Sequence, residues 1–217
     1  MNICIIGNGE DVLEHRHGDF IDNCDHVVRF NHCITEGYEQ WVGSKLDIYC
    51  SPYLWCLERE VRDIEYYKQF NVFWLRQKNP LYKLYNIPTI WYTPEQEANL
   101  AKKINYNEWG VDTMYGNTEI STGLVGIEMA IEQFEGHTIY ITGFDGCKTG
   151  QYRDVKKSND PEHNRLRKIN TSMDLPEWKN NVKRLRIKYH RDQNPYHLER
   201  ILINKYLKDG TLNRINI

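Results

Sequence analysis

The fold follows from one stretch near the start of the chain, Asn2-Ile3-Cys4-Ile5-Ile6-Gly7-Asn8-Gly9. An unbroken apolar run that ends at a Gly-Asn-Gly turn predicts a buried central strand that opens into a tight loop. The two glycines let the backbone approach a ligand closely, and free amides in such a loop can bind a phosphate group.

A second β-branched run follows, from His26 to Asn31. Parallel strands place their carboxyl ends at one edge of a sheet, so these two strands would bring Asn8 and Asn31 to the same ligand-binding crevice. The residues alone are equally typical of an ordinary first βαβ unit with a solvated loop.

The rest of the chain alternates between strand and helix patterns, without a repeat or linker that would divide it. This alternation predicts an α/β fold, a single Rossmann-like domain over residues 1–217 with a mostly parallel central sheet. Ser51-Pro52 ends the third strand, which places Ser51 at the carboxyl edge. Further strands are expected at 46–50, 71–75, 89–92, 137–145, 185–189 and 212–217, and helices at 54–70, 94–107, 123–134, 175–184 and 195–207.

Charge and composition exclude several classes of partner. The net charge of −2 gives no basic surface for nucleic acid or an anionic membrane. No stretch approaches the roughly 20 apolar residues of a spanning helix. Met1 leads directly into the first strand, so no signal peptide is expected. The six cysteines are scattered, as expected for small buried side chains in a reducing compartment.

The second informative region is Ser121-Thr122-Gly123, at the start of an apolar helix. A capped helix start carries free amides and the positive end of the helix dipole, which together favour phosphate binding. A normally capped helix packed on the following strand, which contains Gly143, would give the same pattern.

These stretches resemble the sialyl motifs of the eukaryotic-type sialyltransferase family. The long motif is matched by Ile5-Ile6-Gly7-Asn8-Gly9, by Ile21-Asp22 and Asp25, by Val28-Arg29-Phe30-Asn31, and by the residues that follow, Gly37-Tyr38-Glu39 and Val42-Gly43-Ser44-Lys45. The short motif is matched by Ser121-Thr122-Gly123 and Tyr140-Ile141-Thr142-Gly143-Phe144, and the very short motif more loosely by the helix that contains Glu199. A dinucleotide fingerprint fits less well, because the turn lacks the third glycine.

The resemblance implies a fold of the glycosyltransferase type and an inverting, metal-independent transfer of sialic acid from CMP-sialic acid to a hydroxyl of a glycan acceptor. It implies no cofactor, and the chain has no Asp-x-Asp pair that would hold a divalent metal. Carried over position by position, it implies that donor and acceptor contact Gly7, Asn8, Gly9, Asn31, Ser121, Thr122, Gly123, Gly143, Tyr152 and Glu199. Ser51 is added as a substrate-binding candidate because of its place at the carboxyl edge of the sheet.

The general base is less defined, because Asn194 stands where the family has its histidine. A histidine suits the role, since its ordinary pKa of about 6.5 lets it accept a hydroxyl proton near neutral pH. His197 is the favoured candidate, His190 is the second, and His163 is a further option. Glu199 is expected to support the site and not to attack.

Two alternatives remain open at the level of sequence. The donor could be another CMP-activated keto-deoxy acid sugar, or the chain could bind a sugar nucleotide without catalysis, as Asn194 and Gln151 suggest. Secreted family members join the long and short motifs by a disulfide, for which Cys4 lies one place away and 133–136 offers no partner. A cytoplasmic protein similar to bacterial or viral members is therefore expected, with residues 154–172 as a lid over the donor.

Overall fold

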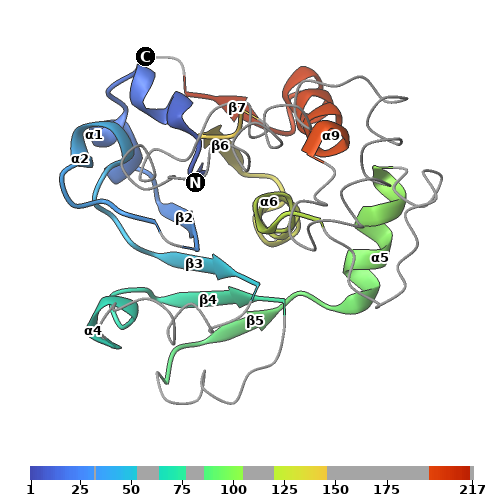
Figure 1. Cartoon of the computed structure of the whole chain (residues 1–217), viewed down its shortest axis with the longest axis horizontal. Helices are drawn as coiled ribbons and strands as arrows, with labels where there is room; N and C mark the ends of the chain where they lie inside the picture. The colour runs from blue at the N-terminus through green and yellow to red at the C-terminus, as the bar shows by residue number, and fades with distance from the viewer. Residues whose placement is uncertain (32, 53–63, 77–85, 105–119, 146–195, 216–217) are drawn as a thin grey trace, which may run out of the picture.

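The computed structural model describes residues 1–31, 33–52, 64–76, 86–104, 120–145 and 196–215. These residues build one seven-stranded sheet in the order β5-β4-β3-β2-β1-β6-β7, and each neighbouring pair is parallel. The expected α/β fold with a parallel central sheet is confirmed (Figure 1). In chain order the strands are β1 (Asn2–Ile6), β2 (His26–Phe30), β3 (Ile48–Ser51), β4 (Val72–Leu75), β5 (Thr89–Trp91), β6 (Thr138–Thr142) and β7 (Asn213–Arg214).

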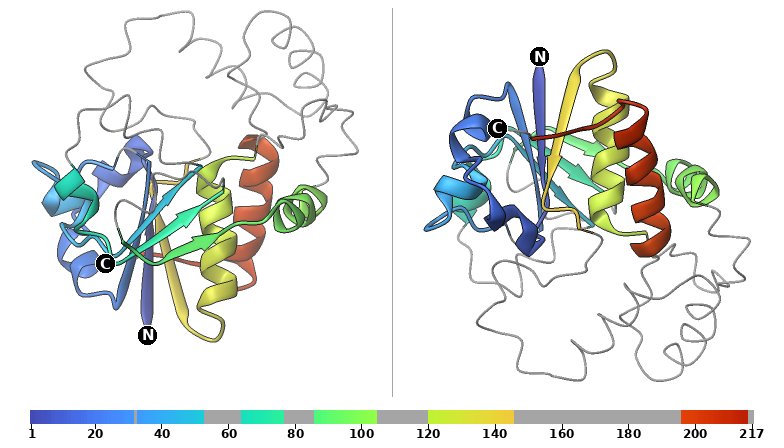
Figure 2. Two further views of the ribbon diagram at one scale, coloured as in Figure 1. Left: turned by 90° about the horizontal axis from the view of Figure 1, so that it is seen from below. Right: turned by 90° about the horizontal axis from the view of Figure 1, so that it is seen from above.

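Helices cover both faces of the sheet (Figure 2). On one face lie α5, α6 and α9, and on the other lie the short helices η1, α1 and α2, which follow β1 and β2. The helices are η1 (Glu10–Glu14), α1 (Gly18–Asp22), α2 (Glu39–Val42), α4 (Ile64–Tyr67), α5 (Pro94–Lys103), α6 (Thr122–Gln133) and α9 (Tyr196–Lys208).

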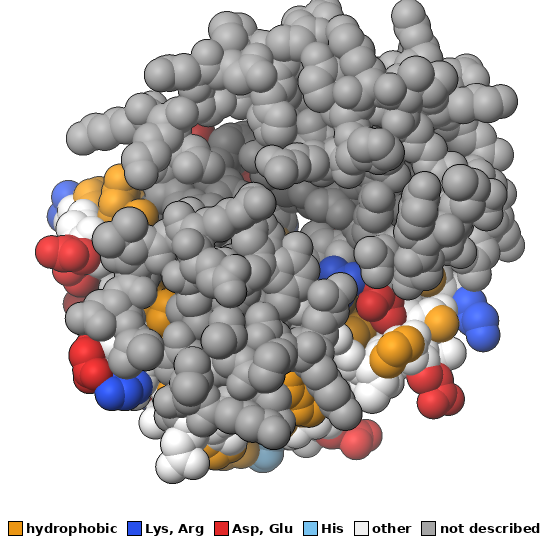
Figure 3. All heavy atoms as spheres, turned by 60° about the horizontal axis from the view of Figure 1, so that its bottom comes forward, with side chains coloured by type: hydrophobic (Ala, Val, Ile, Leu, Met, Phe, Trp, Pro, Cys, Tyr) orange, Lys and Arg blue, Asp and Glu red, His pale blue; other side chains and the backbone are white. Residues whose placement is uncertain are grey.

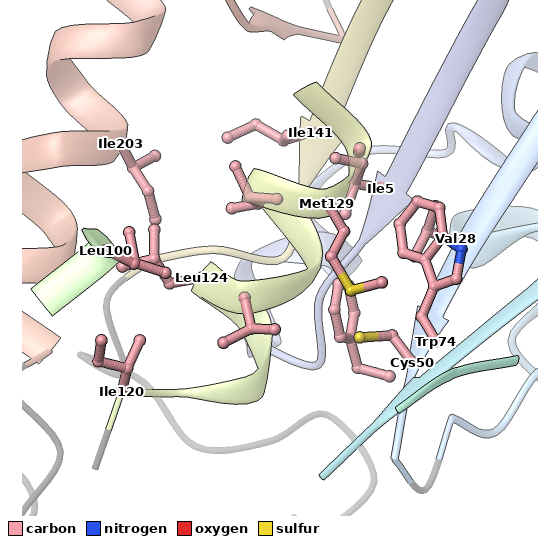
Figure 4. Packing of buried hydrophobic residues seen from close by; sticks show 14 of the residues in the cluster. Ile5, Val28, Cys50, Trp74, Leu100, Ile120, Leu124, Met129, Ile141 and Ile203 are labelled. Atoms are coloured by element: carbon pink, nitrogen blue, oxygen red, sulfur yellow. The ribbon is translucent and has the colours of Figure 1, made fainter. Parts of the chain in front are cut away.

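Alternation along β1 divides the core between the two faces. Ile3 and Ile5 pack with α5, α6 and α9, whereas Cys4 and Ile6 pack with the helices near the N-terminus. A strand buried on both faces must be apolar at every position, which explains the unbroken apolar run. Figure 4 shows the larger core, where Ile5 of the sheet lies near Met129 of α6, and Ile203 of α9 lies on the other side of α6 near Leu100 and Leu124.

The strand and helix ends differ from the expected ones in a few places. The third strand begins at Ile48 and not at Leu46, and before it the carbonyl of Lys45 accepts the Nε–H of Arg29 at 2.8 Å. The strand before Asp145 ends at Thr142, because Gly143 has a φ of 75° that no strand accommodates. The helix expected over 54–70 ends at Tyr67, and its start and the elements expected at 175–189 lie outside the described residues.

The helices α5 and α6 both begin at a side-chain cap. Thr93 and Gln96 form a complete capping box at the start of α5, with Pro94 in the first helical position. Ser121 caps α6, because its Oγ accepts the backbone N–H of Leu124 at 3.1 Å, so this helix begins at Thr122 and not at Gly123.

Many of the residues that resemble the long motif hold the backbone together behind the sheet edge. The Asp22 carboxylate accepts the N–H groups of Ser44 and Lys45 and the Ser44 hydroxyl, at 2.7 to 3.0 Å. Lys45 donates to the carbonyls of Cys24 and Asp25. The fully buried Arg29 bonds the carbonyls of Val42 and Lys45. The turn after α2 is therefore fixed to the start of β2.

Close packing of α6 on β2 predicts a strong effect of one methyl group. A Cβ added at Gly126 would overlap the ring of Phe30, so Gly126→Ala should destabilise the chain by about 1–3 kcal/mol, the usual cost of overpacking a core. Urea denaturation measures the change. Gln133→Ala, on the exposed side of the same helix, is the control and should be near neutral. Equal stability of the two variants would contradict this packing.

Candidate active site

The sheet reverses its strand order between β1 and β6, where an open parallel sheet has its ligand-binding crevice. The Gly7-Asn8-Gly9 turn lies here, but its glycine amides are not free as expected. The N–H of Gly7 donates to the Thr142 carbonyl at 2.8 Å, and the N–H of Gly9 donates to the Gly143 carbonyl at 3.0 Å. These two amides join the strand ends and cannot also hold a phosphate, which corrects that part of the sequence interpretation.

Gly7 and Gly143 are required for this junction. A Cβ at Gly7 would overlap the carbonyl oxygen of Gly143, and a Cβ at Gly143 would lie 2.6 Å from the carbonyl oxygen of Gly7. Neither backbone can move away without breaking the hydrogen bonds between the two turns. The glycines therefore serve the close approach of β1 and β6, whatever ligand binds above them.

Asn8 and Asn31 do lie together at the carboxyl edge, as the sequence predicted. The Asn8 side chain donates through Nδ2 to the carbonyl of Phe30 at 3.2 Å, so it reaches across to the end of β2. Asn31 follows directly, with a left-handed φ of 47°, and its buried Oδ1 has no hydrogen-bond partner among the described residues. An unpaired buried acceptor in an uncommon backbone conformation is typical of a ligand-binding position.

Ser51 and Gly123 lie at the same edge. Ser51 ends β3 and is fully buried. Gly123, in the first turn of α6, packs against Phe144, which makes an edge-to-face contact with Phe30 at 5.7 Å between ring centroids. Phe144 thus packs between the start of α6 and the end of β2.

Glu199 connects the start of α9 to the start of α6. One carboxylate oxygen accepts the backbone N–H of Ser121 at 2.6 Å, and the other accepts its hydroxyl at 2.5 Å. The side chain is almost fully buried. Glu199 therefore supports the capping residue of α6.

Burial raises the pKa of Glu199 from 4.5 to about 7, against the opposing effect of the hydrogen bonds from Ser121 and the charge of Arg76. Its carboxyl group therefore changes charge near neutral pH, next to the helix end where a phosphate is expected.

Sequence reasoning missed two charged residues at this edge. Arg76 follows β4, donates to the carbonyl of Ile120 at 2.8 Å and forms an ion pair with Glu97 of α5. Asp11 lies just after the glycine turn, where burial and then the nearby charge of Asp145 raise its pKa to about 6. Asp11 stands two residues beyond Gly9, so its closeness to the glycine turn could have marked it as a site residue. Nothing in the sequence around Arg76 indicated a site.

The candidate bases are only partly placed. The backbone of His197 lies in the first turn of α9, two residues before Glu199, and its side chain is outside the described atoms. His190, His163, Asn194, Tyr152 and the expected lid over 154–172 lie outside the described residues. The choice of base therefore stays a prediction.

Three comparisons relate the chain to known proteins. Residues 2–79 match the family profile of glycosyltransferase family 29 (sialyltransferase). The resemblance to sialyltransferases is confirmed. The match ends after β4, so the short and very short motifs lie beyond it. A search of curated proteins finds no match.

Solved sialyltransferases have the same fold. A mammalian sialyltransferase is 14% identical, with a TM-score of 0.57, over 99% of this chain and 68% of that one. The monofunctional alpha-2,3-sialyltransferase Cst-I from Campylobacter jejuni is 18% identical, with a TM-score of 0.52, over 98% and 74%. CstII from the same organism, in complex with the substrate analogue CMP-3FNeuAc, is 16% identical, with a TM-score of 0.51, over 98% and 81%. The family match covers residues 2–79, and the chain as a whole shares the fold of these solved sialyltransferases.

Two searches of the described residues were negative. No three His, Cys, Asp or Glu side chains gather there as metal ligands. None of the helices in the described ranges has the length and apolar character needed to cross a membrane. On the face drawn in Figure 3, the acidic and basic side chains that are described are interspersed, and neither gathers into a patch.

The position of Glu199 predicts a pH-dependent stability. Because the folded chain binds this proton more tightly than the unfolded chain, the free energy of unfolding should fall as pH rises from 4.5 to about 7. Glu199→Gln retains an acceptor for the backbone N–H of Ser121 and removes this fall, which is on the order of 3 kcal/mol for a shift of this size. Urea denaturation at several pH values measures it.

The control for this measurement is Glu132→Gln, which neutralises an exposed carboxylate on α6. It should leave the pH dependence of unfolding close to that of the unmodified chain. Identical pH profiles for Glu199→Gln and the unmodified chain would show that Glu199 does not titrate in this range.

Proposed function

We propose that this chain transfers sialic acid from CMP-sialic acid to a hydroxyl group of a glycan acceptor, with inversion and without a metal ion. The observation that carries the proposal is the family match over residues 2–79, a stretch in which Asn8 and Asn31 lie together at the edge of the sheet. CstII, which shares the fold, was solved with a CMP-sugar analogue, and this supports the same class of donor here.

The donor phosphate would lie at the start of α6. The amides of Thr122 and Gly123 are in the first turn, where the helix supplies no carbonyl to accept them, and the Leu124 amide is already capped by Ser121. Among the residues that the structure describes, these two amides have no hydrogen-bond acceptor, and with the positive end of the helix dipole they would stabilise the charge that develops on CMP as it leaves. This location replaces the glycine amides of the first turn as the phosphate site.

The sugar end of the donor would contact Asn31 and Asn8. The buried Oδ1 of Asn31 is an unused acceptor for a hydroxyl or amide N–H of the ligand. Asn8 is held by the carbonyl of Phe30, so its side chain is already oriented before a ligand binds. Preorganised polar groups of this kind give orientation with little loss of entropy on binding.

The base would be a histidine near the start of α9. Glu199 ties this helix to Ser121, so the backbone of His197 is held close to the helix end that would bind the phosphate. In an inverting transfer the acceptor hydroxyl attacks the anomeric carbon while CMP leaves, and the base takes the hydroxyl proton.

Release of CMP from activated sugars tests the reaction. Incubation with CMP-sialic acid and an acceptor glycan should release CMP above the rate without acceptor, and an added chelator should leave that rate unchanged. Loss of turnover with chelator would overturn metal independence. A faster reaction with a CMP-activated keto-deoxy acid would change the donor, and CMP binding without any turnover would identify an inactive sugar-nucleotide-binding protein.

Replacement of the candidate histidines tests the base. His197→Ala should lower turnover by about a hundredfold or more, the usual contribution of a positioned base, with nearly unchanged affinity for CMP. His190→Ala is the matched comparison and should cost less. Steady-state kinetics and calorimetric CMP titration measure both quantities. Near-normal turnover of His197→Ala, with loss in His190→Ala or His163→Ala, would move the base to one of those residues.

A further inference from the structure

The peptide group between Ile120 and Ser121 is held by opposite charges at its two ends. Its carbonyl accepts an N–H of the Arg76 guanidinium at 2.8 Å, and its N–H donates to the Glu199 carboxylate at 2.6 Å. Hydrogen bonds with one ionised partner are about twice as strong as neutral ones. This peptide is the last one before α6.

Two such bonds fix the orientation of the peptide plane. The C=O and N–H of a trans peptide point in opposite directions within one rigid plane, so partners on both sides prevent its rotation. Ser121 is fixed a second time, because its hydroxyl donates to Glu199 and accepts the Leu124 amide. With this plane held and the Ser121 side chain bonded on both sides, the backbone that leads into the amides of Thr122 and Gly123 has little freedom to turn.

Arg76 is itself held in place. It follows β4, and its ion pair with Glu97 fixes the guanidinium to α5. The Arg76 side chain is 15% exposed and that of Glu97 is 17% exposed, so solvent competes little for this pair. Four elements, β4, α5, α6 and α9, thus meet at one peptide group. Figure 4 shows Ile120 beside Leu124, directed toward Leu100 of α5.

We propose that Arg76 is a positioning residue that, with Glu199, clamps the Ile120–Ser121 peptide and so orients the amides of Thr122 and Gly123 toward the donor phosphate. This role for Arg76 rests on the proposed function. It goes further, because Arg76 is not among the residues proposed to contact the sugar or the phosphate of the donor. Arg76 acts through the helix end and does not itself contact the donor. Its charge also opposes the protonation of Glu199.

Amide hydrogen exchange tests the clamp without any ligand. Arg76→Met should speed the exchange of the Ser121 amide by about tenfold or more, because a charged hydrogen bond on the same peptide is lost. Lys103→Met is the control. It removes a different ion pair, which joins Lys103 of α5 to the buried Glu128 of α6. It should lower stability and leave the Ser121 amide unchanged. Equal exchange in both variants would overturn the clamp.

Affinity for CMP tests the consequence for the site. Arg76→Met should weaken CMP binding by about tenfold or more, and Lys103→Met should leave it within about twofold. CMP binding that is normal in Arg76→Met would overturn the positioning role. If the unmodified chain binds no CMP, the proposed function fails, while the exchange experiment still decides whether the clamp exists.

Charge and geometry are separated by Arg76→Lys. An ammonium group keeps the positive charge near Glu199 but cannot bond Ile120 and Glu97 at the same time. This variant should therefore retain the pH dependence of unfolding and lose the protection of the Ser121 amide. In Arg76→Met the pH dependence should move to higher pH, and the added change Glu199→Gln should abolish the difference. If Arg76→Met does not fold, Arg76→Lys alone carries the exchange and binding tests.

Discussion

The close approach of two glycine turns governs the architecture of this protein. Gly7 and Gly143 meet where β1 and β6 end, and the amides of Gly7 and Gly9 are used to join these turns. The sheet reverses its order at the same place. Because side chains are excluded there, the strand ends can sit close enough for Asn8, Asn31 and the start of α6 to share one edge.

A second constraint is the placement of charge at the start of α6. A buried carboxylate and a guanidinium hold one peptide group, and an isolated charge in such a site would be costly. The carboxylate also lies beside a proposed phosphate site, where two negative charges oppose each other. Burial raises the pKa of Glu199 to about 7, so a bound phosphate would meet a carboxyl group that is protonated in part at neutral pH.

The structure divides the motif residues of the first half of the chain into two groups. Asp22, Arg29 and Lys45 satisfy backbone groups behind the sheet edge, and none of their described contacts reaches the crevice. Asn8 and Asn31 lie at the edge itself. The motif therefore contains residues that stabilise the fold as well as residues at the candidate site. The contacts in the structure distinguish the two groups.

The sequence by itself determined the apolar strand β1, the caps at Thr93 and Ser121, the parallel sheet, and the edge position of Asn8 and Asn31. These features depend on neighbouring residues and on strand direction, which a local pattern can show. Tertiary structure alone decided which amides remain free and which charges meet. The bond from Gly7 to Thr142 and the bonds of Arg76 and Glu199 to one peptide join residues far apart in the chain. No local pattern encodes such contacts, since they arise when the strands and helices pack.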